Sequence, residues 1–388
     1  MRTGYVTCSL LVLGLASVIG GCWSGGPTAE ELEGLTPGPT PNRAILVALS
    51  TTVEGIPSDG REVRMWVPLP GSDEHQVLTE RQIQASLRPM VRYGPVHGNP
   101  MVYFSGDEPL PERLSAVVSF KLAMHRCNGP EPGKATALTA KQLELLSAYL
   151  ESSGKEDALK QKVIELDERL EAQEGDATAL SGERAGLMAE LARIADRREL
   201  VQEVVRKLGD EELSSLQKVR KVYDHLLEKL SPVEEVAEKR TLVAAYRSGQ
   251  VSASEYIEVM VTVLRGLGVP ARTEHGILLP EDLGDVETEV TGSHRWVGVY
   301  IGSVGWVPVD PLAAEAKPEL IDYYFGTNCA GRVRVGWGSQ VNLTPVQLGG
   351  PVELFSEPRV EVDETVVPVM YRITVRDLAS GSGRRGGR

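Results

Sequence analysis

Apolar and polar positions alternate with a short period in the first third of the chain. Short apolar or alternating runs at residues 44–49, 63–67 and 114–124 predict β-strands. A cluster of Pro, Ser, Asp and Gly at 56–60 predicts a turn between the first two runs. We therefore expect a small β-sandwich-like domain over residues 43–130.

From residue 136 the spacing of apolar residues becomes helical. The first apolar positions step by four, three and four residues, and they are Leu159, Val163, Leu166 and Leu170. After a break at Gly175, apolar residues keep a heptad register as far as Leu208, although Arg184 and Arg198 occupy positions that should be apolar. We expect a coiled-coil-like helical hairpin inserted over residues 136–210. A single irregular layer of helices is the alternative.

A second helical stretch carries a more specific pattern. Ser252 is followed three residues later by Glu255, a spacing that predicts a capping box at the start of a helix. The helix that follows is apolar on nearly all sides, which predicts burial, and Gly268 and Pro270 end it. A separate amphipathic helix is expected over residues 213–230.

The most informative strand pattern predicts a β-hairpin. Residues 294–301 and 306–310 predict its two strands. His294 and Asp310 should then lie at the same end of neighbouring strands. A carboxylate beside an imidazole fixes the tautomer of the ring and stabilises its cation, as the third member of a catalytic triad does.

These patterns together predict an α+β fold. We expect a core over residues 211–350 in which the buried helix packs on an antiparallel sheet. A further β segment is expected over residues 351–378, and the Gly/Ser/Arg-rich tail at 379–388 should be disordered.

The start of the chain predicts an export signal at residues 1–21. Arg2 precedes an apolar run that is too short to span a bilayer and that ends directly at Cys22. Small residues before a cysteine are typical of a bacterial lipoprotein, so Cys22 is the expected lipidation site. An ordinary cleaved signal is the alternative. Residues 22–42 are rich in Gly and Pro and should form a flexible tether.

The composition of the chain limits the classes of binding partner and cofactor to expect. Of 388 residues, 24% are charged and 41% hydrophobic, as in ordinary globular proteins. The net charge of −13 gives no general attraction to nucleic acid or anionic lipid. The histidines show no spacing typical of metal ligands, so no metal and no other cofactor is expected.

Three segments resemble the transglutaminase-like superfamily, whose fold is related to that of papain-type cysteine proteases. They are Leu-Arg-Gly-Leu-Gly-Val-Pro-Ala-Arg at 264–272, His-Arg-Trp at 294–296 and Gly-Trp-Val-Pro-Val-Asp at 305–310. The resemblance implies that His294 and Asp310 are two members of a triad. It implies a nucleophilic cysteine at the start of the buried helix, fifteen residues before Gly268, where this chain has Ala253.

Other residues are alternative nucleophiles. Ser252 and Ser254 flank the position, but capping of the helix explains each of them better. Cys127 and Cys329 are the other candidate thiols. The alternatives are a disulfide between them or, for Cys329, a buried small hydrophobic side chain. Trp296 and Trp306 are expected to form walls of the substrate cleft or part of the core.

The sequence therefore predicts a lipid-anchored, exported protein of the bacterial cell envelope, on its periplasmic or cell-surface side. With Ala253 in the nucleophile position, we expect a pseudoenzyme that binds a peptide or protein, or serves as a scaffold. The alternative is an active cysteine- or serine-type amidase, peptidase or glutamine-crosslinking enzyme with a displaced nucleophile. A purely structural envelope lipoprotein is a third hypothesis, and nothing in the sequence defines the oligomeric state.

Overall fold

The computed structural model describes residues 43–378 apart from short gaps at 58, 126, 128, 130–135, 151–154, 210–211, 235, 237–239, 281–282, 291–292, 303 and 328–329. The predicted signal, tether and C-terminal tail, with Cys22, lie outside the described residues, as does Cys329. The chain divides into a first unit (residues 1–128, 274–294 and 326–388) and a second unit (residues 129–273 and 295–325). The predicted α+β fold is confirmed.

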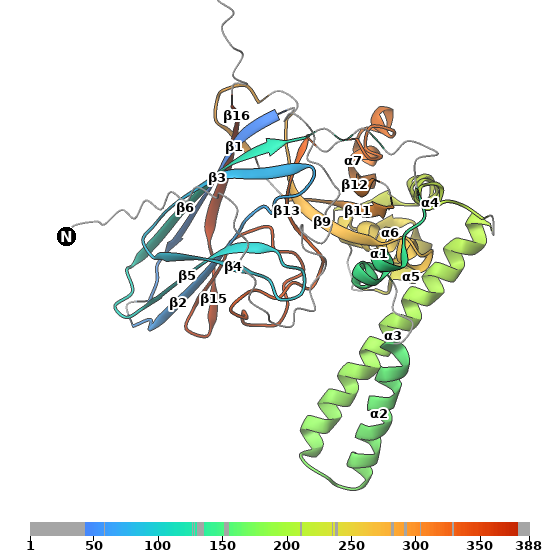
Figure 1. Cartoon of the computed structure of the whole chain (residues 1–388). Helices are drawn as coiled ribbons and strands as arrows, with labels where there is room; N and C mark the ends of the chain where they lie inside the picture. Colours follow the sequence, from blue (N-terminus) through green and yellow to red (C-terminus); the bar gives the residue numbers. More distant parts are fainter. Residues whose placement is uncertain are drawn as a thin grey trace, which may run out of the picture. The chain divides into compact units, whose positions relative to one another are not determined.

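The first unit is built from two five-stranded sheets (Figure 1). One has the order β10 (Thr288–Val290), β16 (Met370–Asp377), β1 (Arg43–Glu54), β6 (Arg113–Met124) and β3 (Gln76–Ala85). The other has the order β15 (Thr365–Val367), β14 (Arg359–Val362), β2 (Glu62–Pro68), β5 (Pro100–Asp107) and β4 (Arg88–Tyr93). The C-terminal strands β14–β16, expected as a separate segment, thus complete both sheets.

Alternation of buried and partly exposed residues along β1 shows which face of the strand packs into the core of this unit. Val47 and Leu49 are buried while their chain neighbours are half-buried, so β1 has one face in the core. Both sheets contribute to one apolar cluster, which includes Val47, Val67 and Phe104. Two further strands, β9 (Ala271–Leu278) and β13 (Arg332–Trp337), pair antiparallel within the same unit from Glu274 onwards.

The second unit contains the helices and one antiparallel hairpin. Its helices are α1 (Ala140–Leu145), η1 (Ser147–Tyr149), α2 (Lys155–Glu171), α3 (Ala177–Leu208), α4 (Ser215–Lys229), α5 (Leu242–Ser248), α6 (Ala253–Gly266), α7 (Pro311–Ala316) and η2 (Pro318–Leu320). The hairpin joins β11 (His294–Ile301) and β12 (Gly305–Val309), and the two short strands β7 (Ser231–Pro232) and β8 (Gln250–Val251) pair in parallel.

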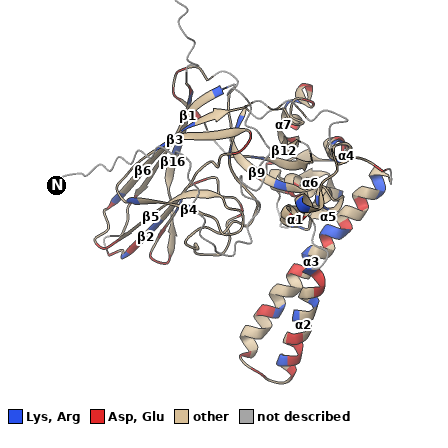
Figure 2. Cartoon of the chain, viewed as in Figure 1, with Lys and Arg blue, Asp and Glu red and all other residues tan. Residues whose placement is uncertain are grey.

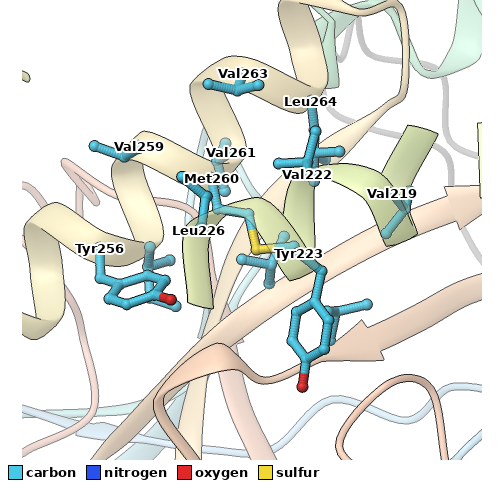
Figure 3. Packing of buried hydrophobic residues seen from close by; sticks show 14 of the residues in the cluster. Val219, Val222, Tyr223, Leu226, Tyr256, Val259, Met260, Val261, Val263 and Leu264 are labelled. Carbon is cyan, nitrogen blue, oxygen red and sulfur yellow. The ribbon is translucent and has the colours of Figure 1, made fainter. Parts of the chain in front are cut away.

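Helix α6 is buried in this unit, as its apolar pattern predicts. Tyr256, Val259, Met260, Val263 and Leu264 are each fully buried. They belong to one cluster with the inner face of α4 and the valines of the hairpin (Figure 3). Burial of a large aliphatic side chain contributes about 1.5–3 kcal/mol, so the cluster fixes α6 firmly.

Two antiparallel helices form the predicted insertion. Helix α2 and the first half of α3 lie side by side (Figure 1), and we call residues 155–193 the arm. Its seam is partly ionic: Arg184 pairs with Asp167 and Arg198 with Glu156, each joining α3 to α2. The two arginines that interrupt the heptad register therefore hold the helices together, so they do not simply weaken the seam.

Candidate functional site

Helix α6 begins at the position where the resemblance implies a nucleophile. Ala253 is its first residue and is exposed to solvent. The preceding Ser252 has extended backbone dihedral angles (φ −68°, ψ 161°), and its hydroxyl accepts a hydrogen bond from the backbone N–H of Glu255 at 3.3 Å. The carboxylate of Glu255 in turn accepts a bond from the N–H of Ser252 at 2.8 Å. The predicted capping box is confirmed.

The hydroxyl of Ser252 is committed to this cap. Besides accepting from the Glu255 N–H, it donates to the carboxylate Oε2 of Glu255 at 3.1 Å and lies 3.2 Å from the hydroxyl of Ser254. The carboxylate that accepts this proton has a lowered pKa, so it is a weak base for activating a serine hydroxyl. These contacts favour capping over nucleophilic attack for both serines.

Arg240 completes the polar network at the start of α6, and the sequence analysis missed it. Its guanidinium contacts both carboxylate oxygens of Glu255, at 2.9 and 3.0 Å, and also bonds the hydroxyl of Ser248 at 3.1 Å. Burial raises the pKa of Glu255, but the hydrogen bonds from Arg240 and Ser252 outweigh it and leave the pKa below its ordinary value. An ionised carboxylate therefore sits at the positive end of the helix dipole.

His294 is the first residue of β11, and Asp310 directly follows the last residue of β12. Val297 on β11 pairs with Val309 on β12, so the residues that precede Val297 and follow Val309 lie at the end opposite the turn. His294 is half-buried, and Asp310 is completely buried. The role of Ala253, His294 and Asp310 as one constellation stays a prediction.

Asp310 also has a clear structural role. It caps helix α7, because its Oδ1 accepts a hydrogen bond from the backbone N–H of Ala313 at 3.0 Å. Its own N–H donates to the carbonyl of Tyr324 at 3.0 Å. Burial raises the pKa of Tyr223, and the negative charge of Asp310 raises it further, which places this carboxylate within electrostatic reach of α4.

The two tryptophans expected to line a substrate cleft are buried. Trp296 is 1% exposed and Trp306 is 5% exposed. The edge of Tyr149, from η1 at the base of the insertion, packs on Trp306 with ring centroids 5.0 Å apart. The guanidinium of Arg272 stacks 3.7 Å from the centre of the same ring. In this structure Trp306 is therefore a buried residue covered by the insertion, and its role as a wall of a substrate cleft stays a prediction.

Only one member of this stack carries a signal in the sequence. Arg272 ends the Val-Pro-Ala-Arg motif, whereas Tyr149 lies in the insertion and has no motif of its own. The amide of Gln142 also bonds the carbonyl of Gly302 in the turn at 3.4 Å. The residues between 136 and 149 therefore tie the insertion to the turn end of the hairpin, away from His294 and Asp310.

Cys127 forms a disulfide bond, so it is not a free nucleophilic thiol in this structure. Within the described residues no three His, Cys, Asp or Glu side chains are grouped as a metal site. Over the same part of the chain, no helix combines the length and the apolar character needed to cross a bilayer.

Comparison with known proteins identifies the core. Residues 198–311, which contain α4, α6 and the hairpin, match the family model described as the transglutaminase-like superfamily. The chain contains a transglutaminase-like core. A comparison with curated proteins found no match.

Solved structures are similar to this chain at low sequence identity. A protein from Cytophaga hutchinsonii, provisionally described as a cysteine protease, is 10% identical with a TM-score of 0.50 over 87% of this chain and 91% of its own. This likeness supports the fold alone. The periplasmic domain of TgpA from Pseudomonas aeruginosa is 12% identical with a TM-score of 0.30, over 79% of this chain and 99% of that domain.

Proposed function

We propose that this protein is an exported, lipid-anchored transglutaminase-like protein that binds a peptide or protein segment without catalysing a reaction on it. The observation that carries the proposal is Ala253 at the first position of α6, where a methyl group replaces the sulfur that the superfamily chemistry needs. The capping contacts of Ser252 and the disulfide of Cys127 support the proposal, because they engage two of the alternative nucleophiles.

The disulfide also supports export. Disulfide bonds persist in oxidising compartments and are rare in the cytosol, so a bonded Cys127 fits the bacterial periplasm or cell surface. Lipid anchoring at Cys22 has a direct test: radiolabelled palmitate should be incorporated into the wild-type chain and not into Cys22→Ser.

Restoring the missing sulfur tests the catalytic part of the proposal. The wild-type protein should release no ammonia from glutamine-containing peptides and should not react with iodoacetamide under native conditions. In Ala253→Cys, the helix dipole and His294 should together favour the thiolate, so that alkylation by iodoacetamide persists to lower pH than for an ordinary cysteine.

A matched control separates the effect of the helix start on the thiol pKa from the effect of His294. Ser215 is the first residue of α4, and it follows the capping-box residue Ser214 just as Ala253 follows Ser252. The pH profile of Ser215→Cys therefore measures what a capped helix start contributes by itself. Ala253→Cys should have the lower thiol pKa, and His294→Ala in the same background should remove the difference.

Two results would overturn the proposal. Ammonia release by the wild-type chain, or an alkylation that His294→Ala abolishes, would show that a nucleophile is present elsewhere. Equal pH profiles for Ala253→Cys and Ser215→Cys would show that His294 does not serve position 253. To test binding, the fluorescence anisotropy of a fluorescein-labelled glutamine-containing peptide should rise when the wild-type protein is added. Mass spectrometry should show no covalent adduct.

A further inference from the structure

Acidic residues are unevenly distributed along the chain. Charges of both signs are spread along the two helices of the arm (Figure 2). In the first unit, by contrast, residues 81–106 and residues 338–352 contain no aspartate or glutamate. Since 54 of the 388 residues are acidic, two segments of this length would ordinarily hold several. Their absence is notable in a chain with a net charge of −13.

The two segments lie side by side in the fold. The hydroxyl of Thr344 donates a hydrogen bond to the backbone carbonyl of Tyr93 at 2.8 Å. A Cβ added at Gly94 would lie 3.3 Å from the carbonyl oxygen of Asn342. The turn that follows β4 and the loop around Thr344 therefore form one continuous surface of the first unit.

The exposed side chains of this surface are apolar. Tyr93 is 54% exposed, Val96 is 48% exposed and Val346 is 64% exposed. Pro95 and Pro345, beside them in the sequence, are exposed as well. We call these five residues the apolar tip. A group of exposed apolar residues with a polar border is typical of an interaction site.

Two arginines of β4 border the apolar tip. Arg88, Met90 and Arg92 alternate along the strand, so their side chains share one face of the sheet. Met90 packs against the apolar cluster beneath the loop at 338–352, so the loop covers this same face. Both arginines are exposed, and neither forms an ion pair with a described residue. Arg92 directly precedes Tyr93 in the sequence.

Acidic residues in the neighbourhood do not reach the apolar tip. Glu361 lies beneath the loop, but it is completely buried and pairs with two arginines. Glu353 lies at the base of the loop, where its carbonyl accepts a hydrogen bond from the N–H of Gln340. Glu62 and Asp107 pair in register at the end of the sheet opposite the apolar tip. The charge that borders the tip is therefore positive.

An anionic membrane surface matches this combination of residues. A tyrosine has an apolar ring and a polar hydroxyl, which suits the boundary between lipid and water. An arginine near an anionic bilayer is attracted to its headgroups. The lipid proposed at Cys22 would keep the first unit close to a bilayer, because the 20 residues between Cys22 and Arg43 span at most about 70 Å.

We propose that the apolar tip and Arg92 form a membrane-docking surface, which binds anionic phospholipid and holds the first unit against the bilayer. The proposal goes beyond the non-catalytic function, and it takes from the proposed function only the presence of a membrane beside the chain.

Co-sedimentation with lipid vesicles tests this surface without the lipid anchor. Residues 22–388 carrying Cys22→Ser have no lipid and retain every described residue. We expect this protein to sediment with vesicles of phosphatidylglycerol and phosphatidylcholine, and not with vesicles of phosphatidylcholine alone. Binding should weaken when salt is raised from about 0.05 to about 0.5 M, because the attraction of arginine to headgroups is screened.

Matched variants locate the contact. Val346→Glu removes an apolar contact and places a carboxylate against anionic headgroups, so binding should weaken by about tenfold or more. Val286→Glu is its control, since Val286 is 69% exposed in the same unit but lies between Asp285 and Glu287.

The arginine has a control of its own. Arg92→Gln should weaken binding by about fivefold, the contribution of one arginine at an anionic surface. Arg113→Gln, at an exposed arginine of β6 that pairs with Glu54, should leave binding unchanged. Circular dichroism should show that all four variants are folded, because the replaced side chains are exposed.

Three results would overturn the proposal. They are a wild-type surface that binds no vesicles at low salt, equal binding to vesicles of phosphatidylcholine alone, and equal affinities for Val346→Glu and Val286→Glu. Vesicle binding does not involve Cys22 or position 253. Failure here would therefore leave the palmitate-labelling and thiol-reactivity results unaffected, and failure of those experiments would leave vesicle binding unaffected.

Discussion

Replacement of Asp310 separates its structural role as a helix cap from its predicted role beside His294. Asp310 is completely buried and accepts the N–H of Ala313 at 3.0 Å. Asp310→Ala removes this cap and leaves the buried N–H of Ala313 without its acceptor, a single loss that costs about 1–3 kcal/mol. We therefore expect the free energy of unfolding to fall by about 1–3 kcal/mol.

Asparagine is the matched replacement because its side-chain oxygen caps a helix as well as aspartate does. Asp310→Asn should therefore keep stability within about 1 kcal/mol of wild type. In the Ala253→Cys background, however, the same change should reduce thiol reactivity, since an uncharged amide no longer stabilises an imidazolium at His294.

Urea denaturation followed by the helical signal in circular dichroism measures the stability of the second unit, which contains the helices, and alkylation by iodoacetamide measures the reactivity. If Asp310→Ala unfolds at the wild-type urea concentration, the capping argument is wrong. If Asp310→Asn is as unstable as Asp310→Ala, the carboxylate charge itself is needed for folding, and the separation of the two roles fails.

Two further predictions concern the same unit. Tyr149→Ala should uncover Trp306, so tryptophan emission should shift to the red and acrylamide quenching should increase, whereas unchanged spectra would show that Tyr149 does not cover the ring. Glu255 and Glu315 should give pH dependences of opposite sign. The pKa of Glu255 is lowered in the fold, so its contribution to stability is present above its ordinary pKa and is lost as pH falls through the lower folded value. Burial raises the pKa of Glu315, against a lowering by the hydrogen bond from Tyr256, so its contribution is present at low pH and is lost as pH rises through the raised value. Between about pH 3 and about pH 7, the urea midpoint should therefore rise less steeply with pH in Glu255→Gln than in the wild type, and more steeply in Glu315→Gln. Parallel curves for the two variants would contradict both assignments.

The sequence predicted the elements whose signals are local. Helix α6 has its start encoded by Ser252 and Glu255 and its end by Gly268, all within one short segment. The hairpin is likewise short-range, because its turn lies between its two strands. Features that depend on residues far apart in the sequence were missed: Arg240 beside Glu255 has no periodic signal, and Tyr149 reaches Trp306 only through the fold.

The arm shows a second limit of pattern analysis. A heptad register assigns apolar residues to the seam and treats Arg184 and Arg198 as faults. In three dimensions each arginine finds a carboxylate on α2, a pairing that depends on the register between two helices and not on the spacing within one.

The position of β16 has a consequence for biosynthesis. This strand lies between β1 and β10. Arg43, the first residue of β1, donates a hydrogen bond to Asp377, the last residue of β16, across a separation of 334 residues. The ribosome makes β16 after every other strand of the described residues, so the first sheet lacks one of its inner strands until residues 370–377 have emerged. The second unit ends at residue 325 and can fold earlier. A nascent chain that stops before residue 370 would leave the hydrogen-bonding edge of β1 open, where it can recruit strands from other molecules.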